Sequence, residues 1–461
     1  MRDPNRDTIV AIATPPGTGA IAVIRISGSK AISIVDEIFQ GKKSLINVPS
    51  QTVHYGCIKA NSLTLSGLEI PVSGIIDDVL VTVFRAPGSY TGEDLVEISC
   101  HGSNFICSRI VAVLLYQGTR VAEAGEYTRR AFLNGKIDLT QAEAVAEIIK
   151  ASTMVSLQGA RNRLDGAIGR EVGNLRKKLI ESAALVEIGL DFLEEDIDLV
   201  DSNHVFVSLE KVRNIIKKMI DTFQKGRILH EGLNVVLTGP PNAGKSSLMN
   251  QLVCESRVLV TEIPGTTRDV IREDLDIHGI PVRLFDTAGL RVTGDEVEKL
   301  GVAQSIKTIK DADIVLFIAA VDEIFPEKSF AQVCELTDRN KIIIIANKID
   351  LCPISFKADL SISALSGTGI KELCELLSDL GLDDSFYTER TALIASVRHK
   401  KNLEVTDDFL CSAQNGLQKD LGYELIAADL RGAISQLEEI IGIVDSDDIL
   451  NDVFANFCIG K

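Results

Sequence analysis

Apolar and polar residues follow a strand-like pattern in the first part of the chain. From residue 8 to about residue 130, short apolar runs rich in β-branched residues (TIVAIAT, AIAVIRIS, DDVLVTVFR) alternate with Pro and Gly turn signals. One longer run, FICSRIVAVLLYQG, is typical of a helix. The pattern predicts a β-rich opening segment that contains a helix or two.

The pattern becomes helical from Leu139 to Phe192, where apolar residues recur at i, i+3 and i+4, and residues 205–230 continue it. Between residue 233 and about residue 380, apolar runs (LNVVLTG, VRLFDT, DIVLFIAAV, KIIIIANK) alternate with helical segments, which is typical of a parallel sheet wound with helices. Helical periodicity returns after Arg390. We therefore predict an α/β domain inserted between two parts of one helical domain.

Composition narrows the class of protein. The chain has 461 residues, 45% of them hydrophobic and 25% charged, which excludes disordered, collagenous and low-complexity chains. Lys and Arg number 48 against 65 Asp and Glu, so the net charge is −17 and any contact with RNA must be local. No apolar run reaches the ~20 residues of a membrane span. Nine cysteines without a CxxC pair favour a reducing compartment, and we expect a cytoplasmic protein.

A phosphate-binding motif follows the LNVVLTG run. Residues 239–246, GPPNAGKS, satisfy GxxxxGK[ST] in the strand, loop and helix context that this motif requires. Its backbone N–H groups can surround phosphates, Lys245 can neutralise the β/γ oxygens, and the Ser246 hydroxyl can bind Mg²⁺. An ordinary glycine-rich turn would look the same, so companion motifs must decide.

Four further motifs follow in the order expected of a GTPase. Asp286 to Gly289 (DTAG) can reach the magnesium shell and the γ-phosphate, and a Thr of residues 265–269 (GTTRD) can reach the metal. Asp350, in NKID, can accept from guanine N1–H and the 2-amino group, donors that adenine lacks. Residues 363–365 (SAL) can support guanine O6. Together these motifs predict a GTPase domain.

The catalytic apparatus departs from the Ras pattern. Leu290 stands where Ras-like enzymes carry a water-orienting glutamine. The alternatives downstream are Arg291, Asp295, Glu296 and Glu298, although this acidic run can also simply decorate a helix N-terminus.

Asn242 in the phosphate loop also has two interpretations. Its side-chain carbonyl can hold a monovalent cation near the β/γ bridge, or it is a plain turn asparagine.

These residues resemble a known family. GPPNAGKS, TEIPGTTRD, DTAGLR with its acidic run, and NKID resemble the potassium-dependent GTPases. The segments DTIVAIATPPGTGAIAVIRISG, YTGEDLVEISCHG and GEYTRRAFLNGKIDLTQAEA, with the final FCIGK, resemble the MnmE (TrmE) family of bacterial tRNA-modification GTPases. The similarity extends over essentially the whole chain.

The resemblance implies a multidomain α/β fold. Its parts would be an N-terminal α+β tetrahydrofolate-binding and dimerising domain (1–135), a helical domain in two parts (136–230 and 389–461) and an inserted Ras-like P-loop G domain (231–388).

The resemblance also implies an activity and partners. The activity would be potassium-dependent GTP hydrolysis that serves the 5-carboxymethylaminomethyl or aminomethyl modification of the wobble uridine (U34) of tRNA. The implied partners are a second copy of the chain and the FAD-containing MnmG (GidA), joined in a heterotetramer. The one-carbon unit would come from 5-formyl- or methylene-tetrahydrofolate.

The resemblance assigns roles residue by residue. Lys245, Glu298 and Cys458 would be catalytic. Glu298 would position the hydrolytic water, and Cys458 would lie near the folate. Potassium would bind Asn242, Thr261, Ile263 and Thr266, magnesium would bind Ser246 and Thr267, and folate would contact Arg25, Glu97, Lys136 and Lys461. GTP would contact Asn242, Ala243, Gly244, Lys245, Ser246, Ser247, Thr261, Glu262, Ile263, Pro264, Gly265, Thr266, Thr267, Asp286, Thr287, Ala288, Gly289, Asn347, Lys348, Asp350, Ser363, Ala364 and Leu365.

The residues by themselves leave alternatives open. Arg25 can be a snorkelling edge arginine, Glu97 a solvated strand residue, and Lys136 a turn lysine. Cys458 can be a free buried thiol. The rival function is a regulatory GTPase of ribosome assembly without base chemistry, and a folate-binding protein with a vestigial nucleotide domain is a third possibility.

Overall fold

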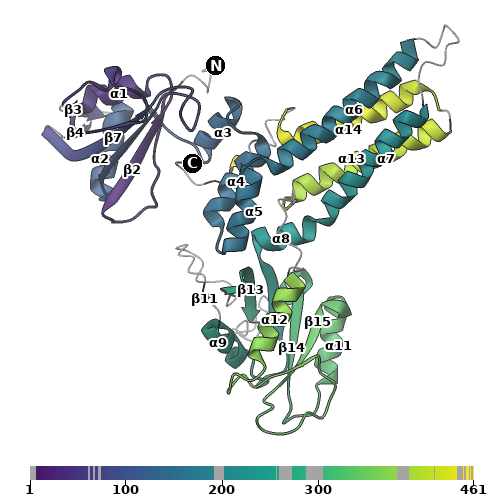
Figure 1. The fold of residues 1–461 in the computed structure, drawn as a ribbon. Helices are drawn as coiled ribbons and strands as arrows, with labels where there is room; N and C mark the ends of the chain where they lie inside the picture. The colour runs from purple at the N-terminus through teal and green to yellow at the C-terminus, as the bar shows by residue number, and fades with distance from the viewer. Residues whose placement is uncertain are drawn as a thin grey trace. The chain divides into compact units, whose positions relative to one another are not determined.

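The chain folds into two compact units. One comprises Met1–Ala146 with Ile441–Lys461, and the other comprises Glu147–Ile440. Figure 1 shows the computed structural model with the elements labelled. It describes residues 7–60, 63–65, 68–70, 74–191, 202–255, 257–258, 272–286, 305–381, 394–419, 421–443, 450, 453–455, 457 and 460.

The first unit is built on a seven-stranded sheet in the order β3-β4-β7-β8-β2-β1-β9. Neighbouring strands are antiparallel except for the parallel pair of β1 and β9. A short hairpin of β5 and β6 belongs to the same unit. The strands are β1 (Ile9–Ile12), β2 (Ile21–Ser27), β3 (Phe39–Gly41), β4 (Thr52–Ala60), β5 (Leu63–Leu65), β6 (Leu68–Ile70), β7 (Gly74–Phe84), β8 (Leu95–His101) and β9 (Arg120–Val121).

Helices α1 (Ala31–Ile38) and α2 (Asn104–Tyr116) cover one face of this sheet. Because successive strand residues point to opposite faces, Ile24 and Ile26 enter the core beneath these helices while Arg25 lies on the other face. The FICSRIVAVLLYQG run is α2, so the helix predicted there is confirmed.

The end of the chain packs with the first unit. Phe454 and Phe457 join Leu139 and Ala142 in one buried cluster. After β9 the chain continues as helices α3 (Glu126–Leu133) and α4 (Leu139–Lys150). Residues from position 450 onwards therefore complete a core whose other members come from residues 132–146.

Long helices form much of the second unit. In Figure 1, α7 and α13 lie side by side, and Arg213 of α7 donates to Asp407 of α13 over 2.7 Å. Likewise, Arg176 of α6 donates to Glu438 of α14. Segments before and after the α/β portion thus form one helical body, which confirms the predicted insertion. The helices are α5 (Met154–Leu164), α6 (Ala167–Asp191), α7 (Ser202–Asp221), α8 (Phe223–Glu231), α13 (Val397–Gln418) and α14 (Tyr423–Ile441).

The α/β portion contains the second seven-stranded sheet, in the order β11-β12-β13-β10-β14-β15-β16. The strands from β13 to β16 run parallel, as the continuous apolar runs predict. Its elements are β10 (Leu233–Thr238), α9 (Lys245–Glu255), β11 (Arg257–Val258), β12 (Arg272–Ile277), β13 (Ile280–Asp286), β14 (Ile314–Ala320), α11 (Glu327–Leu336), β15 (Ile342–Asn347), β16 (Leu360–Ser361) and α12 (Ile370–Gly381).

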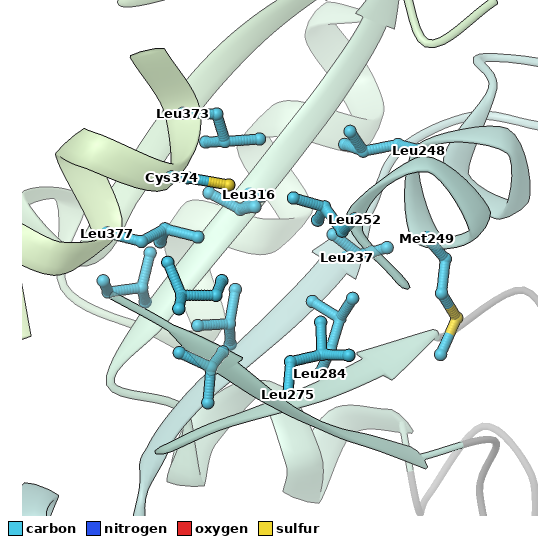
Figure 2. Packing of buried hydrophobic residues seen from close by; sticks show 14 of the residues in the cluster. Leu237, Leu248, Met249, Leu252, Leu275, Leu284, Leu316, Leu373, Cys374 and Leu377 are labelled. Atoms are coloured by element: carbon cyan, nitrogen blue, oxygen red, sulfur yellow. The ribbon is translucent and has the colours of Figure 1, made fainter. Parts of the chain in front are cut away.

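Leucines and isoleucines form most of the core on one side of this sheet. Figure 2 shows Leu237 of β10 and Leu316 of β14 packed among side chains of α9 and α12, and both leucines are fully buried. This packing fixes the start of α9 against the carboxyl ends of the central strands, where ligands bind in such sheets.

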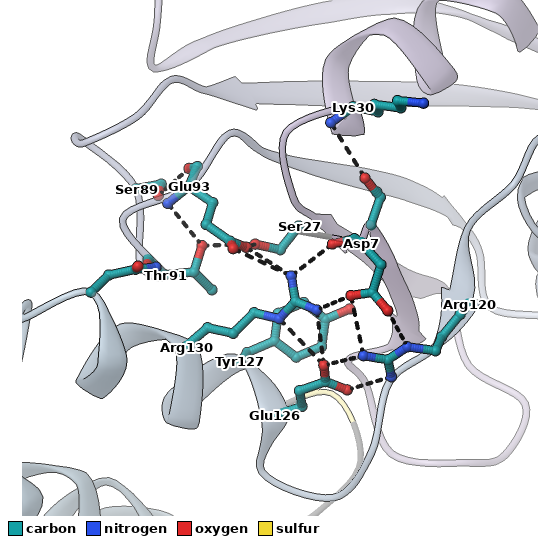
Figure 3. Close-up of polar contacts among 12 residues, drawn as sticks. Asp7, Ser27, Lys30, Ser89, Thr91, Glu93, Arg120, Glu126, Tyr127 and Arg130 are labelled. Atoms are coloured by element: carbon teal, nitrogen blue, oxygen red, sulfur yellow. Dashed lines mark hydrogen bonds and ion pairs between the residues drawn. The ribbon is translucent and has the colours of Figure 1, made fainter. Parts of the chain in front are cut away.

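A partly buried network of ion pairs fastens the start of the first unit to α3 (Figure 3). Arg130, with 3% of its side chain exposed, donates to Asp7, Glu93 and Glu126, and Arg120 donates to Asp7 and Glu126. Burial favours a raised pKa for Glu126, but hydrogen bonds from Arg120, the Glu123 amide and Arg130 outweigh it, so the pKa lies below the ordinary value. The two arginines lower the pKa of Asp7 in the same way, again against the effect of burial.

In the part of the chain that the structure describes, no helix is both long and apolar enough to span a membrane. The four domain boundaries given above remain predictions.

Glu126→Gln should make the stability of the protein less dependent on pH. Because its pKa is lowered on folding, Glu126 stabilises the fold fully above its ordinary pKa of 4.5 and loses this contribution as the pH falls below that value. We expect Glu126→Gln to lower the free energy of unfolding by about 2 kcal/mol at pH 7, and by less at pH 4. Urea unfolding followed by circular dichroism measures both values.

The exposed neighbour Glu123 provides the matched control, and Glu123→Gln should change neither value appreciably. An equal deficit for Glu126→Gln at both pH values would show that the charge of Glu126 is not what stabilises the network.

Candidate functional site

The phosphate loop joins β10 to α9 and requires glycine at two positions. Gly239 and Gly244 have φ values of +140° and +91°. A Cβ at Gly239 would lie 2.2 Å from the Ile318 carbonyl oxygen, and one at Gly244 would lie 2.2 Å from Nδ2 of Asn347. Because neither backbone nor a buried amide can retreat by that distance, the loop can pack this closely only with glycine.

Asn347, at the end of β15, connects three of the predicted motifs. Its side chain is almost fully buried, and Nδ2 donates to the Ala243 carbonyl oxygen over 2.8 Å. Its Oδ1 accepts from the amide of Lys348 at 2.8 Å and from the amide of Ala364 at 3.0 Å. One side-chain amide therefore holds the phosphate loop, the NKID motif and the SAL motif together.

The two oxygen groups expected near magnesium also meet. Leu237 of β10 and Asp286 of β13 are register partners, so the end of β13 lies beside the start of the phosphate loop. The Ser246 hydroxyl donates to Oδ2 of Asp286 over 3.2 Å, and Asp286 is 3% exposed. A hydroxyl beside a carboxylate is a donor set of hard oxygens, which suits Mg²⁺.

Lys245 is held inside the phosphate loop. Its Nζ donates to the carbonyl oxygens of Gly239 at 2.9 Å and Pro240 at 2.7 Å. Since the ammonium group is almost fully buried, the loop keeps a positive charge where phosphate oxygens would lie.

The base-recognition residues are oriented by one another. The Ser363 hydroxyl donates to Oδ1 of Asp350 and accepts from the Ser366 amide at 3.2 Å, so the carboxylate is fixed in direction. The Leu365 side chain is 86% exposed, so this residue would serve a base through its backbone. Lys348 adopts a positive φ of 67° and pairs with Asp322 at 3.1 Å.

Asn242 lies exposed in the phosphate loop with a φ of 62°. Asparagine tolerates this left-handed conformation better than most residues, so the turn alone accounts for its presence. The cation-binding role of Asn242 remains a prediction. Ser247 is exposed on the first turn of α9.

Several predicted site residues lie outside the described residues. They are Thr261, Glu262, Ile263, Pro264, Gly265, Thr266, Thr267, Thr287, Ala288, Gly289, Glu298, Cys458 and Lys461, together with the alternatives Arg291, Asp295 and Glu296. Their assignments remain predictions.

A second polar site lies on the first sheet, on the face opposite α1 and α2. Arg25 and Glu97 are cross-strand partners on β2 and β8, and the guanidinium donates to Oε1 of Glu97 through Nε at 2.9 Å and an NH₂ group at 2.7 Å. The remaining Arg25 nitrogen donates to the Gly460 carbonyl oxygen at 3.1 Å. The structure therefore joins two predicted folate residues to the chain end that carries a third.

Two tyrosines that the sequence analysis missed support this pair. Tyr90 and Tyr127 each place their ring 5.7 Å from the Arg25 guanidinium, and the Tyr127 hydroxyl donates to the Arg25 carbonyl oxygen at 2.7 Å. Burial raises the pKa of both hydroxyls, so both stay protonated. The pattern YTGED with GEYTRR contains these tyrosines, but no spacing in the sequence indicates that they meet.

Lys136 contacts other residues than Arg25 and Glu97. Its Nζ donates to the Pro87 carbonyl oxygen at 2.9 Å, and its stem passes Gly92. No hydrogen bond joins the described Lys136 side chain to Arg25 or Glu97. Its role at a folate site remains a prediction.

The geometry of the nucleotide site defines the class of the α/β portion. A loop that requires two glycines between β10 and α9, a serine hydroxyl hydrogen-bonded to the aspartate that ends β13, and an NKID carboxylate held by a serine are together typical of a G domain of the P-loop type.

Comparisons with known proteins then identify the family. Residues 8–136 match the family described as the GTP-binding protein TrmE N-terminus, and residues 139–458 match the MnmE helical domain. The tRNA modification GTPase MnmE of Carboxydothermus hydrogenoformans is 40% identical over 469 residues, with 99% of each chain covered. That of Moorella thermoacetica is 42% identical over 470 residues, again with 99% of each chain covered. The chain belongs to the MnmE (TrmE) family of tRNA modification GTPases.

A solved structure, the G domain of the T. maritima FeoB iron transporter, is 24% identical and covers 32% of this chain and 99% of its own. Its TM-score is 0.24.

Proposed function

We propose that this GTPase hydrolyses GTP with the help of potassium and, with an FAD-containing partner of the MnmG (GidA) kind, modifies the wobble uridine of tRNA. Family membership supports a GTP hydrolase that acts in tRNA modification. The observation that carries the GTPase part is the buried Asn347 amide, which positions the phosphate loop and the guanine-binding motifs as one site.

Different residues of the G domain would bind the phosphates, the base and the metal. Lys245 and the loop amides would take the phosphates, and Asp350 would accept from the two guanine donors while Ser363 holds it in place. Ser246, with Thr267, would hold Mg²⁺, which supplies positive charge to the β- and γ-phosphate oxygens. An adenine base would leave the Asp350 carboxylate without its donors, so ATP should be rejected.

Potassium would replace the arginine finger that other GTPases use. Asn242 offers a side-chain oxygen at the exposed edge of the phosphate loop, and we assign Thr261, Ile263 and Thr266 as the remaining ligands. A cation there would neutralise charge that develops during hydrolysis, while Glu298 would position the water. Two G domains of a homodimer would approach each other across their phosphate loops.

The Arg25–Glu97 pair supports a folate site in the first unit. Both hydrogen bonds from Arg25 fall on Oε1 of Glu97, which leaves Oε2 for an incoming donor. A pterin presents adjacent ring N–H and amino donors like those of guanine, so Glu97 would repeat the chemistry of Asp350. We place 5-formyl- or methylene-tetrahydrofolate there, with Cys458, Lys461 and Lys136 as further contacts.

Hydrolysis should depend on the identity of the monovalent cation. We expect the GTPase rate of the full-length protein to be at least tenfold higher in potassium chloride than in sodium chloride at equal ionic strength, because Na⁺ is too small for the same ligands. Asn242→Ala should remove most of this difference. Steady-state phosphate release measures both effects, and equal rates of the wild-type protein in the two salts would contradict the cation assignment.

Mutation of the folate site should abolish tRNA modification without abolishing GTP hydrolysis. Mass spectrometry of tRNA nucleosides from a strain that lacks the gene should show unmodified wobble uridine, and the wild-type gene should restore the modification. Glu97→Ala should fail to restore it, because the folate site is lost, while the purified variant still hydrolyses GTP and no longer binds 5-formyl-tetrahydrofolate in calorimetry.

Intact wobble modification in the deletion strain would favour the ribosome-assembly function instead. Undiminished folate binding by Glu97→Ala would remove Glu97 from the site but leave the tRNA function standing.

A further inference from the structure

A cavity of about 290 Å³ lies between α7 and α13, and none of the residues assigned above lines it. Ordinary small-molecule sites occupy ~300–1,000 Å³, so this cavity suits a group of the size of one nucleobase. One helix contributes Phe206, Glu210, Asn214 and Lys217, and the other contributes Gln418 among its lining residues. The lining positions recur every three or four residues along α7 and also along α13, so each helix presents one mostly polar face to the cavity.

The base of the cavity is rigid. Arg213 donates to both carboxylate oxygens of Asp407, at 2.7 and 3.1 Å, and to the Gln414 side chain at 2.6 Å. Gln414 is 6% exposed and donates in turn to the Phe206 carbonyl oxygen at 3.4 Å. Since every one of these groups is held by another, the cavity does not depend on a ligand to keep its shape.

The polar side chains at the rim of the cavity, by contrast, are not engaged by the described part of the protein. Asn214, Lys217 and Gln418 are exposed, and within the described part of the chain none of their side chains has a hydrogen-bond or ion-pair partner. The two amides supply donors and acceptors, Lys217 supplies a positive charge, and Glu210 on the same lining supplies a negative one. Phe206 is half-buried and supplies an apolar surface.

We infer that this cavity binds an unpaired nucleotide of the tRNA, with the base between the amides and Phe206 and a phosphate on Lys217. Proteins read single-stranded RNA by stacking bases on aromatic rings and by bonding base edges to polar side chains. The net charge of −17 argues against RNA binding over the whole surface, so local contacts such as this cavity are favoured. The inference rests on the proposed function, because it takes tRNA as the substrate.

Binding of a fluorescein-labelled tRNA with a wobble uridine to the full-length protein tests this assignment by fluorescence anisotropy. The double variant Asn214→Ala/Gln418→Ala should bind about tenfold more weakly, at a few-fold for each lost hydrogen bond. Lys217→Ala should lower the slope of log affinity against log salt by about 0.7, the value for one phosphate contact on a single strand. Circular dichroism melting verifies that the variants fold.

Matched controls are available on the same helical body. Lys218 is exposed beside Lys217, and Asn174 is exposed on α6, and neither lines the cavity. Lys218→Ala and Asn174→Ala should leave tRNA affinity unchanged. If the cavity variants bind tRNA as these controls do, the cavity is not an RNA site, although the proposed function stands. If the wild-type protein binds no tRNA at all, the cavity assignment falls, whereas the tRNA function is decided by the nucleoside analysis of the deletion strain.

Two further readouts complete the test. Cys411 lines the cavity, whereas Cys254 is exposed on α9, so ultraviolet irradiation of the complex should give nucleotide adducts on the peptide with Cys411 and not on that with Cys254. Adducts confined to other peptides would overturn the inference. Free uridine monophosphate presents the same chemistry, and if it binds in a way that Asn214→Ala abolishes while tRNA affinity is unaltered, the site serves a free nucleotide and not RNA.

Discussion

The nucleotide site depends on one buried amide. Asn347 spans from the phosphate loop to the base-binding loops, and its three hydrogen bonds leave neither end of the side chain unsatisfied. Gly244 is required because the same amide occupies the space of its missing side chain. The phosphate loop and the loops assigned to the base are thereby held at a fixed separation, which would allow the G domain to recognise the whole nucleotide.

Two carboxylates in different units follow the same design. Asp350 is oriented by the Ser363 hydroxyl, and Glu97 is oriented by the Arg25 guanidinium, so in the proposed function each would present a carboxylate of fixed direction to N–H donors of its ligand. The neighbours differ in charge. A neutral hydroxyl leaves the charge of Asp350 for guanine, whereas Arg25 partly neutralises Glu97 and would also face the ligand. The proposed folate site would therefore offer charges of both signs, and the guanine site would offer one.

Much of this arrangement could be predicted from local patterns. The continuous apolar runs gave β10, β14 and β15 because strands buried on both faces have no polar alternation, and the motifs after them fell at the carboxyl ends where loops meet. What the patterns could not give were contacts between distant segments. Nothing in the spacing indicates that Tyr127 supports Arg25 or that Gly460 returns to β2, since only the folded sheet brings these residues together.

The most direct test of this account is the affinity of Asn347→Ala for GDP, measured by calorimetry on the full-length protein. Removing the amide leaves the Ala243 carbonyl and the Ala364 amide without partners, at about 1–3 kcal/mol each, so affinity should fall by about 100-fold or more. Asn402→Ala, which removes another buried asparagine in α13, should leave affinity unchanged. Wild-type affinity for GDP in a folded Asn347→Ala protein would contradict the account.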